Sequence, residues 1–365
     1  MQVKFVRDEG FHKEITRRVD EYFRTTGLSR RDDPRMFLKT AVILLWFWGS
    51  WALLVFAATT WWEGMLLSAS VALAMAGIGF SVQHDANHGA YSNRRGVNHL
   101  VGLTLDMLGG SSYVWRWKHN VYHHMFPNVV GADDDIDIGP LARMAPGQPL
   151  KPVHRFQQFY MWFLYCFLAP KWHFVDDFKN SIQGRIVLGE FPRPRGWALV
   201  ELLAGKLVFL AWALVIPMMF HRWWVVLLCY AWGAALVGLV MSAVFQAAHC
   251  VEEADFPEPR DGADHVTGAW AVRQVETSVD FAQKNPFITW YVGGLNFQIE
   301  HHLLPKVCHI HYPALAPIVR EVSAQYGVRY YARPGFLGAV AAHGHWLKRM
   351  GREAHVPATA ATAAS

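Results

Sequence analysis

Cysteine and charge are both scarce in this sequence. Four Cys among 365 residues form no CxxC pair and support neither a disulfide framework nor a thiolate zinc site. Charged residues make up 17% and hydrophobic residues 53%, a composition typical of a membrane protein. The sequence has no basic run interleaved with aromatic residues, so it gives no indication of a nucleic-acid partner. No cleavable signal peptide is expected, because the chain opens with a charged amphipathic stretch.

Four long apolar runs stand out along the sequence. Each is close to the ~20 residues that cross a bilayer. The short links Glu63-Gly64 and His221-Arg222 join the runs into two hairpins. Two further apolar pieces, about 97–114 and 156–169, are too short or interrupted and are interpreted as interfacial or partly buried helices. The predicted fold is an all-α integral membrane protein with a cytosolic helical cap and four spans at about 40–60, 65–82, 197–220 and 223–245.

The basic residues predict the orientation of these spans. Segments 1–39, 83–196 and 246–365 hold ten, twelve and ten Lys or Arg, whereas the two links hold none and one. The positive-inside rule therefore places the three basic segments and both termini in the cytosol. The predicted organisation is an amphipathic N-terminal segment, a membrane domain and a tail with a disordered end, with limits 1–39, 40–335 and 336–365.

Three histidine clusters lie in the predicted cytosolic segments. They are HDANH at 84–88, HNVYHH at 119–124 and QIEHH at 298–302. On an α-helix positions i and i+4 share a face, so His84 with His88 and His119 with His123 each predict a pair of converging nitrogens. Clustered histidines beside a membrane are costly unless they are functional. Seven imidazoles with no neighbouring Cys predict a nitrogen-rich metal site, formed by His84, His88, His119, His123, His124, His301 and His302.

An eighth imidazole follows the last apolar run. His249 would leave the membrane at the cytosolic rim if the helix continues through FQAAHC. Spacing alone also allows an ordinary interfacial histidine. Eight imidazoles exceed the four ligands that usually satisfy zinc, so two metals are expected to share them. Imidazole suits iron, copper and zinc alike, but a site at the rim of an apolar bundle suits oxidation of a lipid chain and favours iron.

With its three boxes in this order and a hairpin before the first and before the third, the sequence resembles the membrane fatty acid desaturase family from about residue 35 to 335. The resemblance implies a di-iron centre held by the seven box histidines. In acyl-CoA desaturases a histidine on the last spanning helix is also a ligand, and His249 matches it, although the family's Asn one turn earlier is Phe245 here. GADDDID and VEEADFP look like a bacterial acyl-CoA branch, which favours a bacterial inner membrane over the endoplasmic reticulum.

The third box departs from the commonest family pattern. Gln298 replaces its first histidine, as in front-end desaturases, which insert a double bond between an existing one and the carboxyl end. Many of those enzymes carry a fused cytochrome b5 domain with an HPGG motif, which is absent from this sequence. The resemblance therefore implies a separate electron donor, such as ferredoxin or cytochrome b5 with its reductase. The carrier of the fatty acyl substrate stays open among CoA, carrier protein and lipid.

The family reaction uses dioxygen and two electrons to remove two hydrogens from adjacent methylenes, leaving a cis double bond and water. Carboxylates and amides near the boxes are expected to orient the imidazoles or act as weak ligands, and the candidates are Gln298, Asp85, Glu300 and Asp133 to Asp135. Histidines outside the clusters are expected to be dispensable, namely His12, His154 and His343.

Three alternative functions remain open on the sequence. A hydroxylase, acetylenase or ketolase could use the same di-iron scaffold. A haem-binding membrane electron carrier would need paired histidines inside facing spans, whereas these clusters lie outside them. A metal transporter would need polar residues through the bilayer centre, and the spans offer little beyond Glu201 and Lys206.

Overall fold

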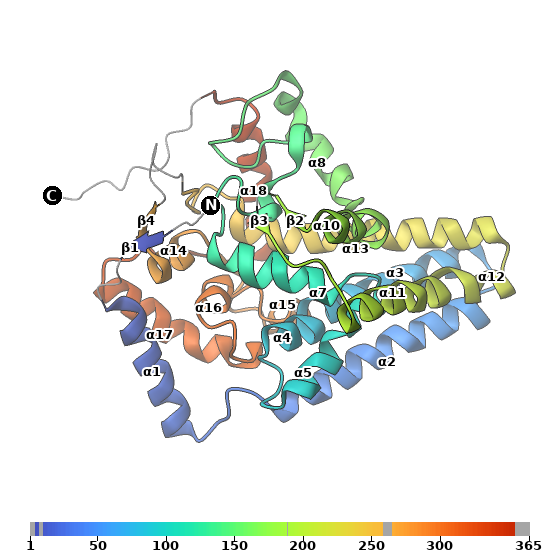
Figure 1. Ribbon diagram of the computed structural model, residues 1–365, viewed down its shortest axis with the longest axis horizontal. Helices are drawn as coiled ribbons and strands as arrows, with labels where there is room; N and C mark the ends of the chain where they lie inside the picture. The colour runs from blue at the N-terminus through green and yellow to red at the C-terminus, as the bar shows by residue number, and fades with distance from the viewer. Residues whose placement is uncertain (1–3, 7–9, 188, 258–264, 355–365) are drawn as a thin grey trace.

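The computed structural model describes residues 4–6, 10–187, 189–257 and 265–354. Four helices in this part of the chain are long and apolar enough to cross a membrane, namely Pro34–Phe56, Trp61–His88, Trp197–Phe220 and Trp223–His249. In Figure 1 they run along the long axis of the molecule, and most of the shorter helices gather at one end, here named the cap. The prediction of a mostly helical membrane protein with four spanning helices is confirmed.

Side-chain caps fix where the first two spans begin. Helix α2 (Pro34–Phe56) starts ahead of the predicted span, because the Asp33 carboxylate accepts from the backbone N–H of Arg35 and Pro34 fits the first helical turn. Helix α3 (Trp61–Gly77) starts at a capping box between Thr60 and Glu63. It continues through the π-helical turn η1 (Ile78–Val82) into α4 (Gln83–His88). The first histidine box therefore lies on the helical continuation of the second span.

The second hairpin brings another histidine to the same end. Its first arm is α11 (Trp197–Leu210), the π turn η7 (Ala211–Val215) and α12 (Ile216–Phe220). Its second arm, α13 (Trp223–His249), is one unbroken helix of 27 residues. At 1.5 Å per residue this is about 40 Å, longer than a hydrocarbon core of about 30 Å. The last turns of α13 therefore project into the cap and carry His249 with them.

Two short segments are inserted between the spans. The Lys206 ammonium of α11 donates to the carbonyls of Gly109 and Trp172 and pairs with the Asp177 carboxylate at 2.7 Å. The Trp212 indole N–H donates to the Met107 carbonyl. Helix α6 (Thr104–Met107) and helix α9 (Leu168–Lys171) thus lie against the sides of the spans, in agreement with the interpretation as partly buried helices. Pairing also explains how a lysine is tolerated within a span.

The cap has its own hydrophobic core. Helix α1 (Phe11–Thr26) places apolar residues four positions apart, from Phe11 through Ile15 and Val19 to Phe23, and all four are buried. They pack on α17 (Tyr312–Gln325) and α16 (Gln298–Leu303), so the third histidine box sits inside this core. Helix α1 ends at Gly27, whose φ of 67° is the left-handed conformation that glycine adopts without strain.

The remaining helices connect these parts. They are α5 (Arg95–Gly102), α7 (Ser112–Trp115), the π helix η2 (Arg116–His123), η3 (Asp134–Ile136), η4 (Gly139–Leu141), η5 (Pro152–Phe156), α8 (Gln157–Tyr165), the π turn η6 (Trp172–Asp176), α10 (Asp177–Gln183), α14 (Trp270–Glu276), α15 (Pro286–Tyr291), η8 (His309–His311) and α18 (Phe336–Met350). Sheet structure in the described ranges is limited to three short pairs: β1 (Lys4–Val6) parallel to β4 (His265–Ala269), β2 (Arg185–Ile186) antiparallel to β3 (Gly189–Glu190), and β5 (Asp280–Phe281) parallel to β6 (Ala332–Arg333).

Candidate metal centre

One group of imidazoles, here named group one, joins all three histidine boxes. It consists of His84 and His88 from α4, His119 from η2 and His301 from α16, and one ring nitrogen of each lies within 4.8 Å of the others. The Nε2 atoms of His84 and His119 are 3.2 Å apart. All four side chains are buried. The pairing of His84 with His88 predicted from i, i+4 spacing is present.

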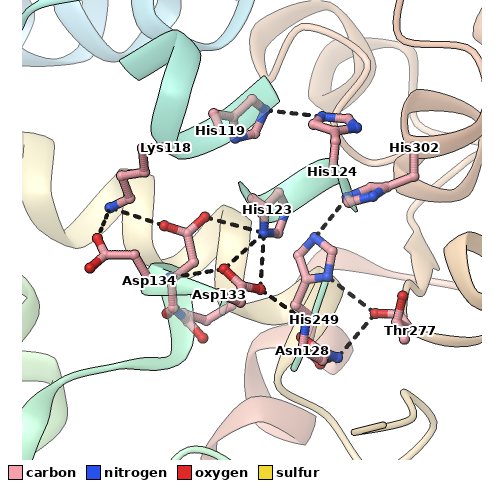
Figure 2. Close-up of polar contacts among 12 residues, drawn as sticks. Lys118, His119, His123, His124, Asn128, Asp133, Asp134, His249, Thr277 and His302 are labelled. Atoms are coloured by element: carbon pink, nitrogen blue, oxygen red, sulfur yellow. Dashed lines mark hydrogen bonds and ion pairs between the residues drawn. The ribbon is translucent and has the colours of Figure 1, made fainter. Parts of the chain in front are cut away.

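A second group, here named group two, lies beside the first. It consists of His123, His249 and His302, again with ring nitrogens within 4.8 Å of one another. The Nε2 atoms of His249 and His302 are 3.3 Å apart, and Figure 2 shows the His249 ring between His302 and Thr277. The length of α13 brings His249 to this position. The structure thus gathers every histidine proposed from the sequence into one buried region.

The second box is not the α-helical pair that the spacing predicted. Residues Arg116–His123 form a π helix, in which the backbone N–H of His124 bonds to the carbonyl of His119 five residues earlier. His119 lies in group one and His123 in group two, yet their ring nitrogens also lie within 4.8 Å of each other and of an Asp135 oxygen, so the predicted convergence is present. His124 lies between the groups, with its Nε2 3.3 Å from His119 and 3.0 Å from His301 and its ring stacked on His302.

The far ring nitrogens of group two are each held by an oxygen. His123 Nδ1 lies 3.1 Å from the Asp133 carboxylate, and His302 Nδ1 lies 2.8 Å from the Gln274 side-chain oxygen. His249 Nδ1 lies 3.1 Å from the Thr277 carbonyl, as Figure 2 shows. Each oxygen accepts from an N–H at Nδ1, which leaves the Nε2 lone pair directed into the group.

Group one has weaker support. His301 Nδ1 lies 3.4 Å from the Tyr312 hydroxyl, and His119 stacks on the Trp115 ring at 4.4 Å. Two expected orienting carboxylates point elsewhere. The Asp85 carboxylate pairs with His309 Nδ1 at 2.8 Å, and Glu300 accepts from the Tyr330 hydroxyl. Among the described contacts neither touches a box imidazole, because in each case the helix turns the carboxylate away from the adjacent histidine.

Burial sets the protonation of the cap imidazoles. Desolvation, then the neighbouring imidazoles, lowers the pKa of His119, His301 and His302 well below the usual value. Neutral imidazoles keep a lone pair for a metal. Burial would also lower the pKa of His123, but the Asp133 carboxylate outweighs it and raises that pKa. Burial alone would lower the pKa of Lys118, whereas Asp134 and Asp135 at 2.7 and 3.1 Å raise it.

These side chains fit a metal site. His88 Nε2 and His124 Nδ1 are buried and have no hydrogen-bond partner in the described structure, which is costly for a polar atom unless a ligand satisfies it. In both groups, Nε2 atoms of neighbouring histidines lie only 3.0–3.3 Å apart. Neutral imidazoles that already carry their proton on Nδ1 have none to share at Nε2. A donor set of imidazoles without a thiolate suits iron, copper or zinc.

Sequence comparison decides the family. The fatty acid desaturase family model matches residues 59–334. This chain belongs to that family. The chain is 41% identical over 355 residues to the sn-1 linoleoyl-lipid 6-desaturase of Arthrospira platensis, covering 96% of this chain and 95% of that protein. It is 37% identical to the enzyme of the same name from Synechocystis sp., over 96% and 98% of the two chains. It is also 37% identical to the acyl-lipid (8-3)-desaturase of Physcomitrium patens, over 94% and 72%.

The protein is a multi-pass membrane fatty acyl desaturase, and a cavity beside its histidines matches that activity. The cavity, about 390 Å³, touches His84 and His119 of group one and His123 and His249 of group two. Its other walls are mostly apolar, contributed by Ile138, Leu141, Met161, Leu164, Tyr165, Phe167, Leu168, Trp172, Met241, Phe245 and Leu295. An apolar cavity that meets both imidazole groups suits an acyl chain with two adjacent carbons to be oxidised.

The desaturase also contains contacts that the sequence did not reveal. Gln274, Thr277 and Tyr312 hold imidazoles from outside any motif, and no local pattern marks them. Gln298 was singled out, and its Nε2 lies 3.0 Å from His249 Nε2 in group two.

The expectation that histidines outside the clusters are dispensable for activity stays a prediction, but two of them have structural contacts. His343 is 1% exposed and bonds both the Cys250 carbonyl and the Tyr165 hydroxyl. His154 is equally buried and bonds the Lys151 N–H and the Pro140 carbonyl. Both stabilise the cap, because a buried polar group that loses its partners is costly. His12 lies partly exposed against the Trp270 ring.

Proposed function

We propose that this protein is a front-end acyl-lipid desaturase that inserts a cis double bond at position 6 of a linoleoyl chain. The observation that carries the proposal is the apolar cavity that reaches both imidazole groups. The position and the lipid-linked substrate are supported by the names of the two cyanobacterial relatives. The Gln at position 298 in the third box, at 3.0 Å from His249, supports the front-end class.

Two irons are proposed for the two groups. His84, His88, His119 and His301 would hold one, and His123, His249 and His302 the other, with His124 between them. When bound, the irons supply the reduction of dioxygen that removes hydrogen from an unactivated methylene. The chain's own residues orient the imidazoles and enclose the reacting carbons. Asp133, Gln274 and the Thr277 carbonyl keep the protons of group two on Nδ1, and the apolar walls exclude water from the reacting carbons.

The proposed setting is a bacterial inner membrane. The cap, the active site and both termini would face the cytosol, as the Lys and Arg count of the three polar segments requires. The two electrons would come from a separate protein on that side, such as ferredoxin or cytochrome b5 with its reductase. Labelling of cysteines introduced near Glu63 and near His119 in sealed vesicles checks the orientation, with opposite accessibility expected at the two sites.

Expression in a bacterial host that makes no desaturated C18 products, with linoleate supplied, tests the function. Gas chromatography with mass spectrometry should show a new triene with a double bond at carbon 6, and the purified protein should contain close to two irons. The matched control is His119→Ala, which should make no triene. A hydroxylated, acetylenic or keto product would contradict desaturation, and a Soret band in place of non-haem iron would favour a haem carrier.

A further inference from the structure

A second cavity lies between the two hairpins, toward the end of the spans opposite the cap. Its volume is about 650 Å³, and its lining includes Thr59 and Thr60 of the first link and His221 and Arg222 of the second. Figure 1 places both links at the end of the molecule remote from the cap, and from there the cavity reaches inward to His173 of η6. It shares no lining residue with the cavity beside the imidazole groups, so it is a separate feature of the fold.

The walls of this second cavity are mostly apolar. All four spans contribute to them, with Leu54, Val71, Phe209 and Val226 as one example from each. An empty space of this size forfeits the dispersion contacts of its lining, and water has few polar partners along such walls. Several lining side chains are exposed at the surface of the spans, among them Leu228, so the cavity is open to the bilayer. An acyl chain is therefore the natural filling for the apolar part.

The polar groups at the inner end of this cavity are bonded to each other. His173 Nδ1 lies 2.8 Å from the Tyr230 hydroxyl, and both residues line the cavity. A ligand with a polar head at this depth, such as a quinone ring, would have to compete with that bond. The inner end is therefore suited to the apolar tail of a ligand, and the head is expected near the links.

Most polar groups near the links are occupied as well. His221 Nε2 bonds the Val55 carbonyl at 2.8 Å, which ties the second hairpin to the first. The backbone N–H groups of Thr59 and Thr60 both donate to the Glu63 carboxylate, so the charge of Glu63 is engaged by its own helix end. These contacts hold the links in place and leave little free hydrogen-bonding capacity for a ligand.

Two polar groups of the lining remain without a protein partner. The Ser68 side chain is 3% exposed, and its hydroxyl has no hydrogen-bond partner in the described structure. Ser68 follows Trp61, the first residue of α3, by seven positions, or about 10 Å. Arg222 is exposed, forms no ion pair among the described residues and is the one Lys or Arg of the two links. A phosphate would pair with this guanidinium, and an ester carbonyl deeper in the cavity would accept from the Ser68 hydroxyl.

We propose that this second cavity binds one anionic phospholipid from the membrane leaflet remote from the cap. The headgroup phosphate pairs with Arg222, an ester carbonyl accepts from Ser68, and one acyl chain fills the space toward His173 and Tyr230. The bound lipid contacts all four spans and so stabilises the packing of one hairpin on the other. The site is independent of the imidazole groups and of the reaction that they support.

Lipid retention measured by native mass spectrometry tests the headgroup contacts. Delipidated protein in detergent receives phosphatidylglycerol, phosphatidylcholine or a neutral prenyl quinone. The wild type should retain one phosphatidylglycerol, with an affinity about tenfold above that for phosphatidylcholine. Arg222→Gln should abolish this preference, and Ser68→Ala should weaken both lipids about threefold. The control is Arg195→Gln, an exposed arginine just before α11 and outside the lining, which should keep the preference.

Filling the cavity tests the place of the acyl chain. A Cβ on Gly233 would meet the Ser68 carbonyl oxygen at 3.5 Å and the Ala72 Cβ at 3.9 Å, which are ordinary contacts. Gly233→Leu can therefore place its side chain in the cavity and should abolish lipid retention, whereas Gly233→Ala should retain the lipid. Phosphatidylglycerol should raise the thermal unfolding temperature of the wild type and of Gly233→Ala, and leave that of Gly233→Leu unchanged.

A cysteine already present in the lining gives a readout without mutation. Cys229 lines the cavity, whereas Cys166 at the end of α8 does not. Phosphatidylglycerol should slow the reaction of Cys229 with an apolar maleimide more than phosphatidylcholine does, with no such difference at Cys166. Equal retention of the two lipids, an unchanged preference in Arg222→Gln, retention by folded Gly233→Leu, or binding of the quinone in place of lipid would each overturn the site.

Discussion

The two imidazole groups differ in how firmly the protein holds them. Each histidine of group two has an oxygen at its Nδ1, from Asp133, Gln274 or the Thr277 backbone, at 2.8–3.1 Å. In group one the corresponding contact is the 3.4 Å approach of Tyr312 to His301. Gln298 also lies close to His249 of group two, although it is not a member of the group. The comparison teaches that neighbouring ligand sets built from the same residue type are fixed by different surroundings, so that outer-sphere changes should affect them unequally.

Removing one histidine from α16 should separate the two groups most clearly. His301→Ala is expected to leave group two loaded, and His302→Ala to leave group one loaded, so each purified variant should retain about one of the two irons. Both should lose turnover entirely, because the reaction needs both metals. Elemental analysis and fatty acid profiling check this, with His12→Ala as the control that keeps both irons. Retention of both irons in either variant would contradict the assignment of ligands to groups.

Removing an outer partner should affect group two far more than group one. Asp133→Ala deletes the acceptor for His123 Nδ1 and for the backbone N–H of Asn128, and activity or iron affinity should fall about 10–100-fold. Tyr312→Phe removes only a long contact and should lower activity less than about threefold. Steady-state rates with iron titration compare the two. Equal losses would break the distinction between the groups.

Gln298 should affect turnover without holding a metal. A neutral amide is a poor iron ligand, but its N–H can orient His249 or a water in group two. Gln298→Ala is expected to reduce turnover about tenfold and to keep most of the iron. Turnover and iron content are measured on the same preparation. Loss of half the iron would make Gln298 a ligand, and full activity would make it irrelevant to the reaction.

A change outside both groups should lower stability and leave the comparison intact. His343→Ala removes the bonds to the Cys250 carbonyl and the Tyr165 hydroxyl. The free energy of unfolding should fall by about 1–3 kcal/mol, because two buried partners lose their hydrogen bonds. Thermal unfolding in detergent measures the loss, and the iron content at low temperature should equal that of the wild type. Unequal iron loss between the two groups would show that His343 also positions ligands.

The spans and the histidine boxes were predictable because their signals are local. A run of about twenty apolar residues and a repeated HxxxH or HH spacing are each visible in a short window. The π helix at Arg116–His123 was not predictable from the α-helical spacing, although the ring nitrogens of His119 and His123 converge as that spacing predicted. The packing of α8 and α9 on α13 depends on contacts of Tyr165 and Ala169 with residues far away in sequence. Gln274 and Tyr312 are likewise identified only when the folded chain brings them to the imidazoles.

The position of α16 in the chain also determines when the site can form. Both groups take a histidine from this helix, His301 for one and His302 for the other. During synthesis the two hairpins, with His84, His88 and His249, leave the ribosome before the third box does. Neither group can close until residue 302 has emerged and α16 has docked in the cap. Iron loading is therefore expected to be the last step of biogenesis, after membrane insertion, and a chain that stops after α13 would be inserted with both groups incomplete.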